Sequence, residues 1–291
     1  MRYYHHTSES QQVRIMTNDN ILRVKKSCLD LINDAWHFNE VLFTGLAYNF
    51  NDQGSLINLI KIENGKDNGV SDDYLATPED TGNRIDLDFE DDEYDDDYTY
   101  WNNLRFCGIG YIFTVSGILT EEISYSFGDR HNESRRWHPT GNLASKYNKD
   151  ENWHWHENGT LWMHEVNNAS GGFAYEIEIN DSKAIESLAI ENEYSAHPND
   201  IAEHEVSQSL ELRGEGINDN VLSEITSKKS FNKLEELSLI NTSIYKNTIL
   251  ALDLKNLRTL NLSDNTYMTQ DIIEELEAKH PLCTIHSTLS I

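Results

Sequence analysis

The strongest constraint on this chain is an internal duplication, in which residues 43–65 and residues 106–128 align without a gap. Eight positions are identical in the two segments, and all eight are aromatic, glycine or aliphatic residues. A unit that recurs in this way stacks on its neighbours, because one copy cannot bury its apolar face alone. The duplication therefore predicts a repeat architecture. The identical pairs are Phe43 and Phe106, Gly45 and Gly108, Tyr48 and Tyr111, Phe50 and Phe113, Gly54 and Gly117, Leu56 and Leu119, Ile60 and Ile123, and Gly65 and Gly128.

A shorter unit lies within and beyond the duplication, in which an aromatic residue is followed by Gly and then by Leu at a fixed spacing. Aromatic residues two positions upstream, such as Tyr48 and Tyr111, place the rings on one face of a strand. The Gly permits a tight turn with positive φ, and the Leu restarts the apolar face. Each unit is therefore predicted to be a β-hairpin. The four copies are Phe50–Leu56, Phe113–Leu119, Trp137–Leu143 and Trp155–Leu161.

Apolar residues in the last third of the chain follow a different pattern. The segment Leu234–Asn241 recurs 23 residues later as Leu257–Asn265, with apolar residues at the first, fourth and sixth positions of each. Looser copies are Ile185–Ile190, Leu210–Leu212 and Cys283–Ile285. The pattern predicts five short parallel strands with helices between them. One such helix is expected to begin after Thr269, which could cap it.

Both patterns resemble known families. The segments Val41–Tyr48, Asn51–Leu56 and Glu63–Lys66 are similar to the MORN-repeat variant, in particular to YwqK-like proteins. Trp137–Leu143 and Trp155–Leu161 fit the same repeat. This resemblance implies an antitoxin or immunity protein of a secreted bacterial toxin, and it brings no catalytic residues with it. Such repeats serve many scaffolds, so they are specific for fold rather than for function.

The second pattern resembles the leucine-rich repeat, with Asn265 at the place of the usual asparagine and Asn241 one residue early. We therefore predict a mixed repeat protein, in which antiparallel β-hairpin (MORN-like) repeats are followed by an α/β leucine-rich-repeat solenoid. The leucine-rich half is not part of the usual antitoxin pattern. The expected parts are an N-terminal extension (1–20), a hairpin-repeat domain (21–178) with an acidic loop (86–97), and a leucine-rich-repeat domain (179–291).

The charge of the chain limits its partners. Its 50 Asp and Glu against 23 Lys and Arg give a net charge of −27, which opposes binding to nucleic acid or to an anionic membrane and favours a basic partner. No apolar stretch is long enough for a transmembrane span or a signal core, so we expect a cytoplasmic protein. Cys28, Cys107 and Cys283 lie far apart, which supports neither a disulfide framework nor a thiolate metal site.

The densest charge lies at residues 86–97, where nine of twelve residues are acidic and none is basic. Three interpretations stay open: a solvated loop, a partner surface with Phe89 and Tyr94 as apolar anchors, and a calcium loop. The Gly and final Glu of an EF-hand are missing. The predicted partner-binding residues here are Phe89, Glu90, Asp91, Asp92, Glu93, Tyr94, Asp95, Asp96 and Asp97. Others, between the leucines of the second pattern, are Glu211, Arg213, Glu235, Glu236, Arg258 and Asn261.

The segment Trp153–Glu157, with His138 and His164 nearby, could suggest a metal site. Strand alternation explains it better, with both tryptophans facing the core and both histidines facing solvent. No phosphate-binding loop, nucleophile elbow or dinucleotide fingerprint occurs, so we expect no enzyme, no metal and no cofactor.

The expected function is that of an immunity protein, which binds and neutralises a cognate secreted toxin by protein–protein contact in the cytoplasm. The toxin is expected to be basic, such as a nuclease, because surfaces that grip phosphates are basic. The alternative is a non-catalytic leucine-rich-repeat interaction scaffold or a secreted effector that binds a host or cell protein.

Overall fold

The computed structural model describes residues 21–73, 83–87, 99–102, 104–168, 173–191, 201, 204–265 and 267–288. These residues form mostly β-strands with few helices, as the sequence predicts. The chain divides into two compact units. The first unit holds Met1–Ala144 and Glu157–Gly159, and the second holds Ser145–His156 and Thr160–Ile291.

The first copy of the duplication forms a four-stranded sheet and a small three-stranded sheet in the first unit. In the larger sheet one parallel strand joins an antiparallel meander, in the order β1-β5-β6-β7. Its strands are β1 (Leu22–Lys25), β5 (Gly45–Phe50), β6 (Leu56–Glu63) and β7 (Lys66–Val70), and the 3-10 helix η1 (Lys26–Cys28) follows β1. The small sheet contains β2 (Asp30–Ile32), β3 (Ala35–Phe38) and β4 (Val41–Leu42).

The second copy repeats this arrangement, and its central hairpin has the same boundaries. Adding 63 to the bounds of β5 and β6 gives β11 and β12, and the turn residues Gly54 and Gly117 both have positive φ. A parallel strand again precedes the meander, in the order β8-β11-β12-β13. The 63-residue spacing therefore holds in the backbone. The strands are β8 (Arg84–Asp86), β9 (Tyr100–Trp101), β10 (Leu104–Arg105), β11 (Gly108–Phe113), β12 (Leu119–Ser126) and β13 (Asp129–Trp137).

The two copies pack on each other through equivalent residues. The Tyr48 and Tyr111 rings lie 5.1 Å apart, and the Phe50 and Phe113 rings lie 5.8 Å apart, edge to face. The parallel strand of each copy bonds the turn of the other: Lys25 N–H donates to Gly117 O, and Asp86 N–H donates to Gly54 O, both at 2.8 Å. This reciprocal exchange makes a pseudo-two-fold pair with a shared aromatic core.

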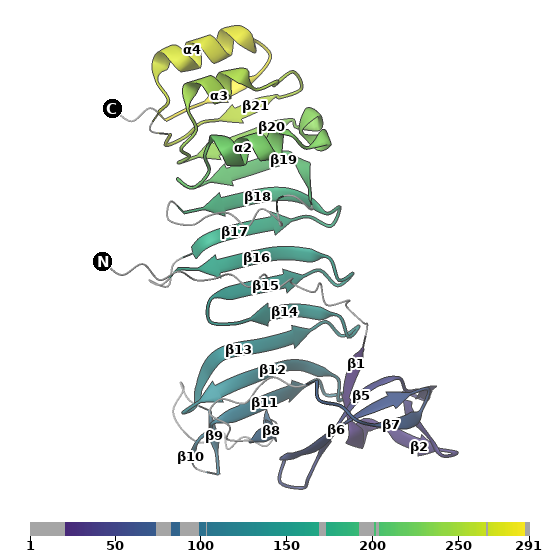
Figure 1. Cartoon of the computed structure of the whole chain (residues 1–291). Helices are drawn as coiled ribbons and strands as arrows, with labels where there is room; N and C mark the ends of the chain where they lie inside the picture. The colour runs from purple at the N-terminus through teal and green to yellow at the C-terminus, as the bar shows by residue number, and fades with distance from the viewer. Residues whose placement is uncertain are drawn as a thin grey trace. The chain divides into compact units, whose positions relative to one another are not determined.

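The second unit begins with antiparallel strands and ends with parallel strands (Figure 1). Strand β18 is the junction, because it pairs antiparallel with β17 and parallel with β19. The five parallel strands β18 to β22 lie at the five segments that the second sequence pattern predicts. The strands are β14 (Leu143–Tyr147, which crosses the unit boundary), β15 (Glu151–Trp155), β16 (Leu161–Asn167), β17 (Phe173–Ile179), β18 (Ala184–Ile190), β19 (Glu205–Arg213), β20 (Glu236–Ile240), β21 (Thr259–Asn261) and β22 (Thr284–His286).

Helical segments follow the parallel strands and lie one after another beside them (Figure 1). They are α2 (Asp219–Thr226), η4 (Lys229–Lys233), α3 (Lys246–Ala251) and α4 (Gln270–Lys279). Asn218 caps α2, because its side chain accepts from two backbone N–H groups. Thr269 lies at the N-cap of α4, but its side chain makes no capping bond, so the predicted side-chain cap is wrong. The Thr269 carbonyl instead accepts from Ile272 and Ile273.

The periodic leucines form the core of the second unit. Leu212, Leu239 and Leu260 are fully buried, and Leu188 lies in the same cluster. Residues between them point to the other face of the strands, because successive side chains alternate. We call this second face, on β16 to β21, the polar strand face.

Candidate functional site

Most of the predicted acidic contact surface lies outside the described residues. This applies to Phe89, Glu90, Asp91, Asp92, Glu93, Tyr94, Asp95, Asp96 and Asp97. The first residue of the predicted acidic loop is not a loop residue. Asp86 ends strand β8, is only 2% exposed, and pairs with Lys25 at 2.5 Å.

The other predicted contact residues lie on or beside the polar strand face. Register places Ser187, Glu211, Ser238 and Asn261 side by side on four neighbouring strands. Glu236 lies beside Ser209, whose hydroxyl donates to its carboxylate at 3.1 Å. Of the remaining predicted residues, Arg213 ends β19, and Glu235 and Arg258 each directly precede a strand.

Several of these charges are paired with each other. Arg213 pairs with Glu211, and Arg258 pairs with Glu235 at 3.3 Å. The Asn261 side chain accepts from the backbone N–H and the hydroxyl of Ser263, so it shapes the end of β21. The face therefore combines acids with arginines and is not uniformly negative.

Four carboxylates on the same face, the carboxylate cluster, are Glu165, Glu176, Glu178 and Glu211. Only Glu211 was predicted from the sequence, and the other three were missed. Strand pairing sets Glu165 beside Glu176, and Ser187 between Glu178 and Glu211. Burial and the neighbouring Glu178 and Glu165 raise the pKa of Glu176, although Arg213 opposes the rise. The alternation of Glu176 and Glu178 with the buried Ile177 and Ile179 is the sequence signal that could have found the cluster.

Two of the cluster carboxylates are held by polar neighbours. The Asn152 amide donates to Glu165 at 3.1 Å, and the Ser187 hydroxyl donates to Glu178 at 3.0 Å. These bonds orient the carboxylates on strands whose other face is packed against the core. Carboxylates held at neighbouring strand positions favour a cationic partner, because a cation relieves their mutual repulsion.

The histidine and tryptophan segment is packed on both faces. Trp153 stacks on His164 at 5.1 Å, and His164 is buried, with Nε2 3.4 Å from the Glu151 carboxylate. On the other face His154 meets the Trp162 ring edge-on at 5.6 Å. The period-two alternation holds, but the expected contrast between buried tryptophans and solvated histidines does not. Trp153, Trp155, His154 and His156 are all half-buried. Within the described parts of the chain, no group of three or more His, Cys, Asp or Glu could hold a metal ion.

A buried asparagine joins two successive parallel strands. Asn265 Oδ1 accepts from Thr242 N at 2.7 Å and from Thr242 Oγ1 at 2.6 Å, and its Nδ2 donates to Leu239 O. Asn241 and Asp264, which are 23 residues apart, both have left-handed φ, near 53° and 60°. Thr242 is therefore the equivalent of Asn265, and Asn241 is a turn residue rather than an early copy of the asparagine.

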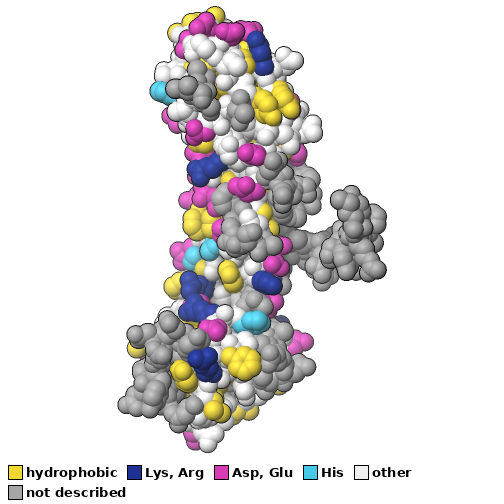
Figure 2. Space-filling view, turned by 90° about the vertical axis from the view of Figure 1, so that its left-hand side faces the viewer, with side chains coloured by type: hydrophobic (Ala, Val, Ile, Leu, Met, Phe, Trp, Pro, Cys, Tyr) yellow, Lys and Arg dark blue, Asp and Glu magenta, His cyan; other side chains and the backbone are white. Residues whose placement is uncertain are grey.

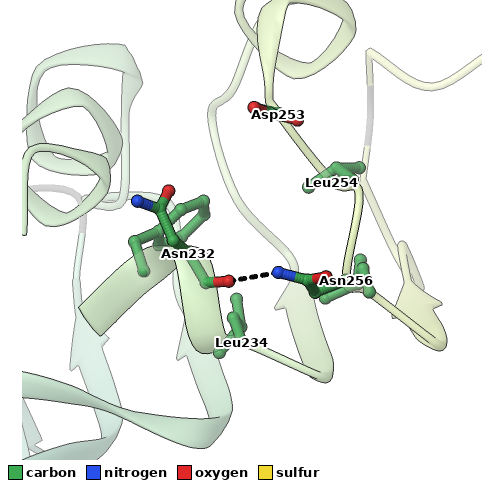
Figure 3. A pocket seen from close by; sticks show the side chains of 7 residues that line it. Asn232, Leu234, Asp253, Leu254 and Asn256 are labelled. Carbon is green, nitrogen blue, oxygen red and sulfur yellow. Dashed lines mark hydrogen bonds between the residues drawn. The ribbon is translucent and has the colours of Figure 1, made fainter. Parts of the chain in front are cut away.

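A small crevice opens between two successive turns near Leu234, Leu254 and Asn256 (Figure 3). Asn256 Nδ2 donates to Asn232 O at 2.5 Å across it. Its volume of about 10 Å³ is enough for roughly one water molecule, so it is a packing feature.

One side of the molecule carries charges of both signs (Figure 2). Figure 2 shows Asp and Glu side chains recurring along one face, with Lys and Arg between them and hydrophobic side chains in separate groups. Among the described residues, no helix is long and apolar enough to cross a membrane.

Comparisons with known proteins give no family. No family model and no curated protein matches the chain. The structure of TarM aligns with a TM-score of 0.22 and 10% identity over 64% of this chain and 40% of that chain. A component of the glycosylation-associated Gap123 complex from Streptococcus agalactiae aligns with a TM-score of 0.21 and 17% identity, over 62% and 40%. This chain thus spans less than half of either protein, and similarity at this level transfers neither fold nor activity.

Proposed function

We propose that this chain is a non-catalytic immunity protein, which binds a basic toxin in the cytoplasm and neutralises it by protein–protein contact. The observation that carries the proposal is the carboxylate cluster. Three of its members, Glu165, Glu178 and Glu211, are oriented by Asn152, Ser187 and Arg213, on strands supported by a leucine core. A preformed, rigid and negatively charged face reduces the ordering cost of binding a cationic surface.

The net charge of −27 supports the same partner. Long-range attraction speeds the encounter with a basic protein and disfavours polyanions. A nuclease fits this requirement, because surfaces that hold phosphates are basic. The toxin context comes from the resemblance of the hairpin segments to YwqK-like proteins. In this proposal the parallel strands are leucine-rich repeats that enlarge the interface of a MORN-like hairpin domain.

The test compares two variants with the same change in net charge. Glu176→Gln, Glu178→Gln and Glu236→Gln neutralise the polar strand face, whereas Glu224→Gln, Glu274→Gln and Glu277→Gln neutralise carboxylates of α2 and α4. A basic toxin captured from the native lysate should bind the first variant at least about tenfold more weakly than the second. Its activity should be inhibited by the wild-type chain. Equal weakening in both variants would show that only overall charge matters, and uninhibited activity would reject the immunity function.

The mixed pairing on the polar strand face favours a second candidate, an interaction scaffold or secreted effector. Arg213 and Arg258 lie among the acids, so the face can also match a partner of mixed charge. Capture of a partner that is neither basic nor toxic, by contacts sensitive to Arg258→Gln, would support this candidate over immunity.

A further inference from the structure

The first unit contains a cavity of about 510 Å³ next to the pseudo-two-fold pair, within the size range of small-molecule sites. Residues of the first copy line most of it, and Asp86 of β8 closes one side. The lining residues that matter below are Lys25, Lys26, Trp36, Asn49, Asp52 and Asp86.

The duplication provides an internal comparison for this cavity. The parallel strands pair Lys25 with Tyr48 and Asp86 with Tyr111, so Lys26 is the equivalent of Leu87. Leu87 is buried in an apolar cluster and lies against Gly110, where an added Cβ would come within 2.8 Å of it. Lys26, in contrast, is half-buried and borders the cavity.

Two other positions are also polar in the first copy and apolar in the second. The 63-residue spacing makes Asn49 the equivalent of Ile112 and Asp52 the equivalent of Val115. Ile112 packs against the apolar cluster that contains Leu87. The second copy is therefore apolar where the first copy presents an ammonium, an amide and a carboxylate around an open volume.

The chemistry of the lining is polar but balanced in charge. Two lysines offset two aspartates, and Lys25 and Asp86 already pair at 2.5 Å. In a chain with a net charge of −27, a cavity without net charge is suited to a neutral ligand. The Asn49 amide is oriented by a 3.0 Å bond from its Nδ2 to Asn58, so its remaining polar atoms are presented in a defined direction.

Trp36 adds an aromatic surface to this lining, and the Lys26 ammonium lies 5.3 Å from its ring. A ligand that matches has one apolar face for the indole and several hydroxyl groups for the amide, ammonium and carboxylate. We propose that this cavity binds a neutral saccharide, with Trp36 as the platform and Asn49 and Asp52 as hydrogen-bonding groups. This proposal is independent of the proposed toxin binding, which rests on the carboxylate cluster of the second unit.

The experiment is an NMR titration of the full-length chain that follows the tryptophan indole N–H signals. Trp36→Phe assigns the relevant signal, and Trp162→Phe is the control for an exposed tryptophan elsewhere. The probes are glucose, galactose, maltose and lactose, with glucose 6-phosphate as the anionic comparison. A saturable shift of the Trp36 signal by a neutral sugar, without a shift of the Trp162 signal, is the expected result.

Substitutions taken from the second copy remove polar groups from the lining of the cavity. The double variant Lys26→Leu and Asn49→Ile introduces the residues of Leu87 and Ile112, and binding should be lost. If this variant fails to fold, Asp52→Val in an exposed turn should still weaken binding by about tenfold or more. No shift with any neutral sugar up to about 50 mM, a shift with glucose 6-phosphate alone, or unchanged binding by Asp52→Val would overturn the proposal.

Discussion

The two compact units use repetition in different ways. In the first unit two copies exchange hydrogen bonds reciprocally and bury their equivalent rings against each other, so each copy completes the core of the other. In the second unit the parallel strands add one after another, and each buries its leucines against its neighbours. A reciprocal pair is closed by its own two copies, whereas a linear stack leaves one strand face open for contact.

The buried polar residues of the first unit form the clearest contrast. Glu122 is fully buried and pairs with Arg135, which also pairs with Asp73 at 3.1 Å. Asp73 in turn pairs with Arg23 at 2.9 Å, and both guanidinium groups lie over the Trp137 ring. Glu122 and the two arginines of this network are largely buried, and Asp73 lies at its partly exposed edge. The members of the carboxylate cluster are half-buried on an open face, and among the described residues they have no such buried partner network.

The largest expected effect is the loss of the buried pair at the centre of this network. Arg135→Met removes the guanidinium from the buried Glu122 carboxylate and should destabilise the first unit by about 3–5 kcal/mol. The adjacent Arg136, whose side chain is 54% exposed, pairs with Glu121 and serves as the control. Arg136→Met should cost less than about 1 kcal/mol. Urea denaturation measures the unfolding free energy of both variants. Equal losses would show that the buried pair contributes no more than an exposed ion pair.

Removal of a stacked leucine should have a comparable or slightly smaller effect on the second unit. Leu239 is fully buried, and Leu239→Ala should cost about 2–5 kcal/mol through lost burial and a residual cavity. Leu282 is almost fully exposed, so Leu282→Ala should change the unfolding free energy by less than about 0.5 kcal/mol. Hydrogen exchange would locate the loss, and protection that falls equally in both units would contradict separate cores.

The asparagine that joins β20 to the next turn should have an intermediate effect. Asn265→Ala leaves the Thr242 hydroxyl and the Leu239 carbonyl without their partner, at a cost of about 1–3 kcal/mol. The exposed Asn256 makes one side-chain bond, to Asn232 O, and Asn256→Ala is the control. In thermal unfolding, Asn265→Ala should lower the midpoint more than Asn256→Ala does. The reverse ranking would contradict a stabilising role of Asn265 between the two turns.

The dependence of stability on pH should have opposite signs in the two units. Burial of Asp73 raises its pKa, but Arg135 and Arg23 outweigh burial and lower it overall. Asp73 therefore stabilises the folded state fully above about pH 5, and this contribution is lost as the pH falls through the lowered pKa. Asp73→Asn should destabilise the chain at pH 7 and lose most of its effect in acid. A loss that is the same at both pH values would contradict the charge role.

Glu176 should give the smallest effect. Its pKa is raised, so the folded state binds its proton more readily than the unfolded state does, and ionisation of Glu176 costs stability as the pH rises. Glu176→Gln should slightly raise the unfolding midpoint at pH 7 and have no effect at pH 3. A lower midpoint at pH 7 would mean that the carboxylate is stabilised by its surroundings.

Much of the strand pattern could be predicted from the sequence. The identical turn glycines set the bounds of β5, β6, β11 and β12, since strand alternation and turn chemistry are local properties. The leucine spacing likewise located the five parallel strands. The side-chain cap at Thr269 and the equivalence of Asn241 were wrong, because both depend on hydrogen bonds of neighbouring backbone rather than on spacing.

The sites were less predictable. Glu165, Glu176 and Glu211 lie on three different strands, and only strand register brings them into one cluster. The charge pattern predicts one acidic loop at residues 86–97, yet Asp86 at its start is buried and pairs with Lys25. Composition reports how many charges exist, but burial and pairing are decided by which strands become neighbours.

The sequence by itself determined the periodicities, the core positions and the sign of the net charge. These follow from the geometry of a strand and from the need to bury apolar faces. Only the tertiary structure decided that the two copies complete each other, that Lys26 borders a cavity where Leu87 is buried in an apolar cluster, and which carboxylates share a face. Those features depend on contacts between residues distant in sequence, whose register and packing no local pattern encodes.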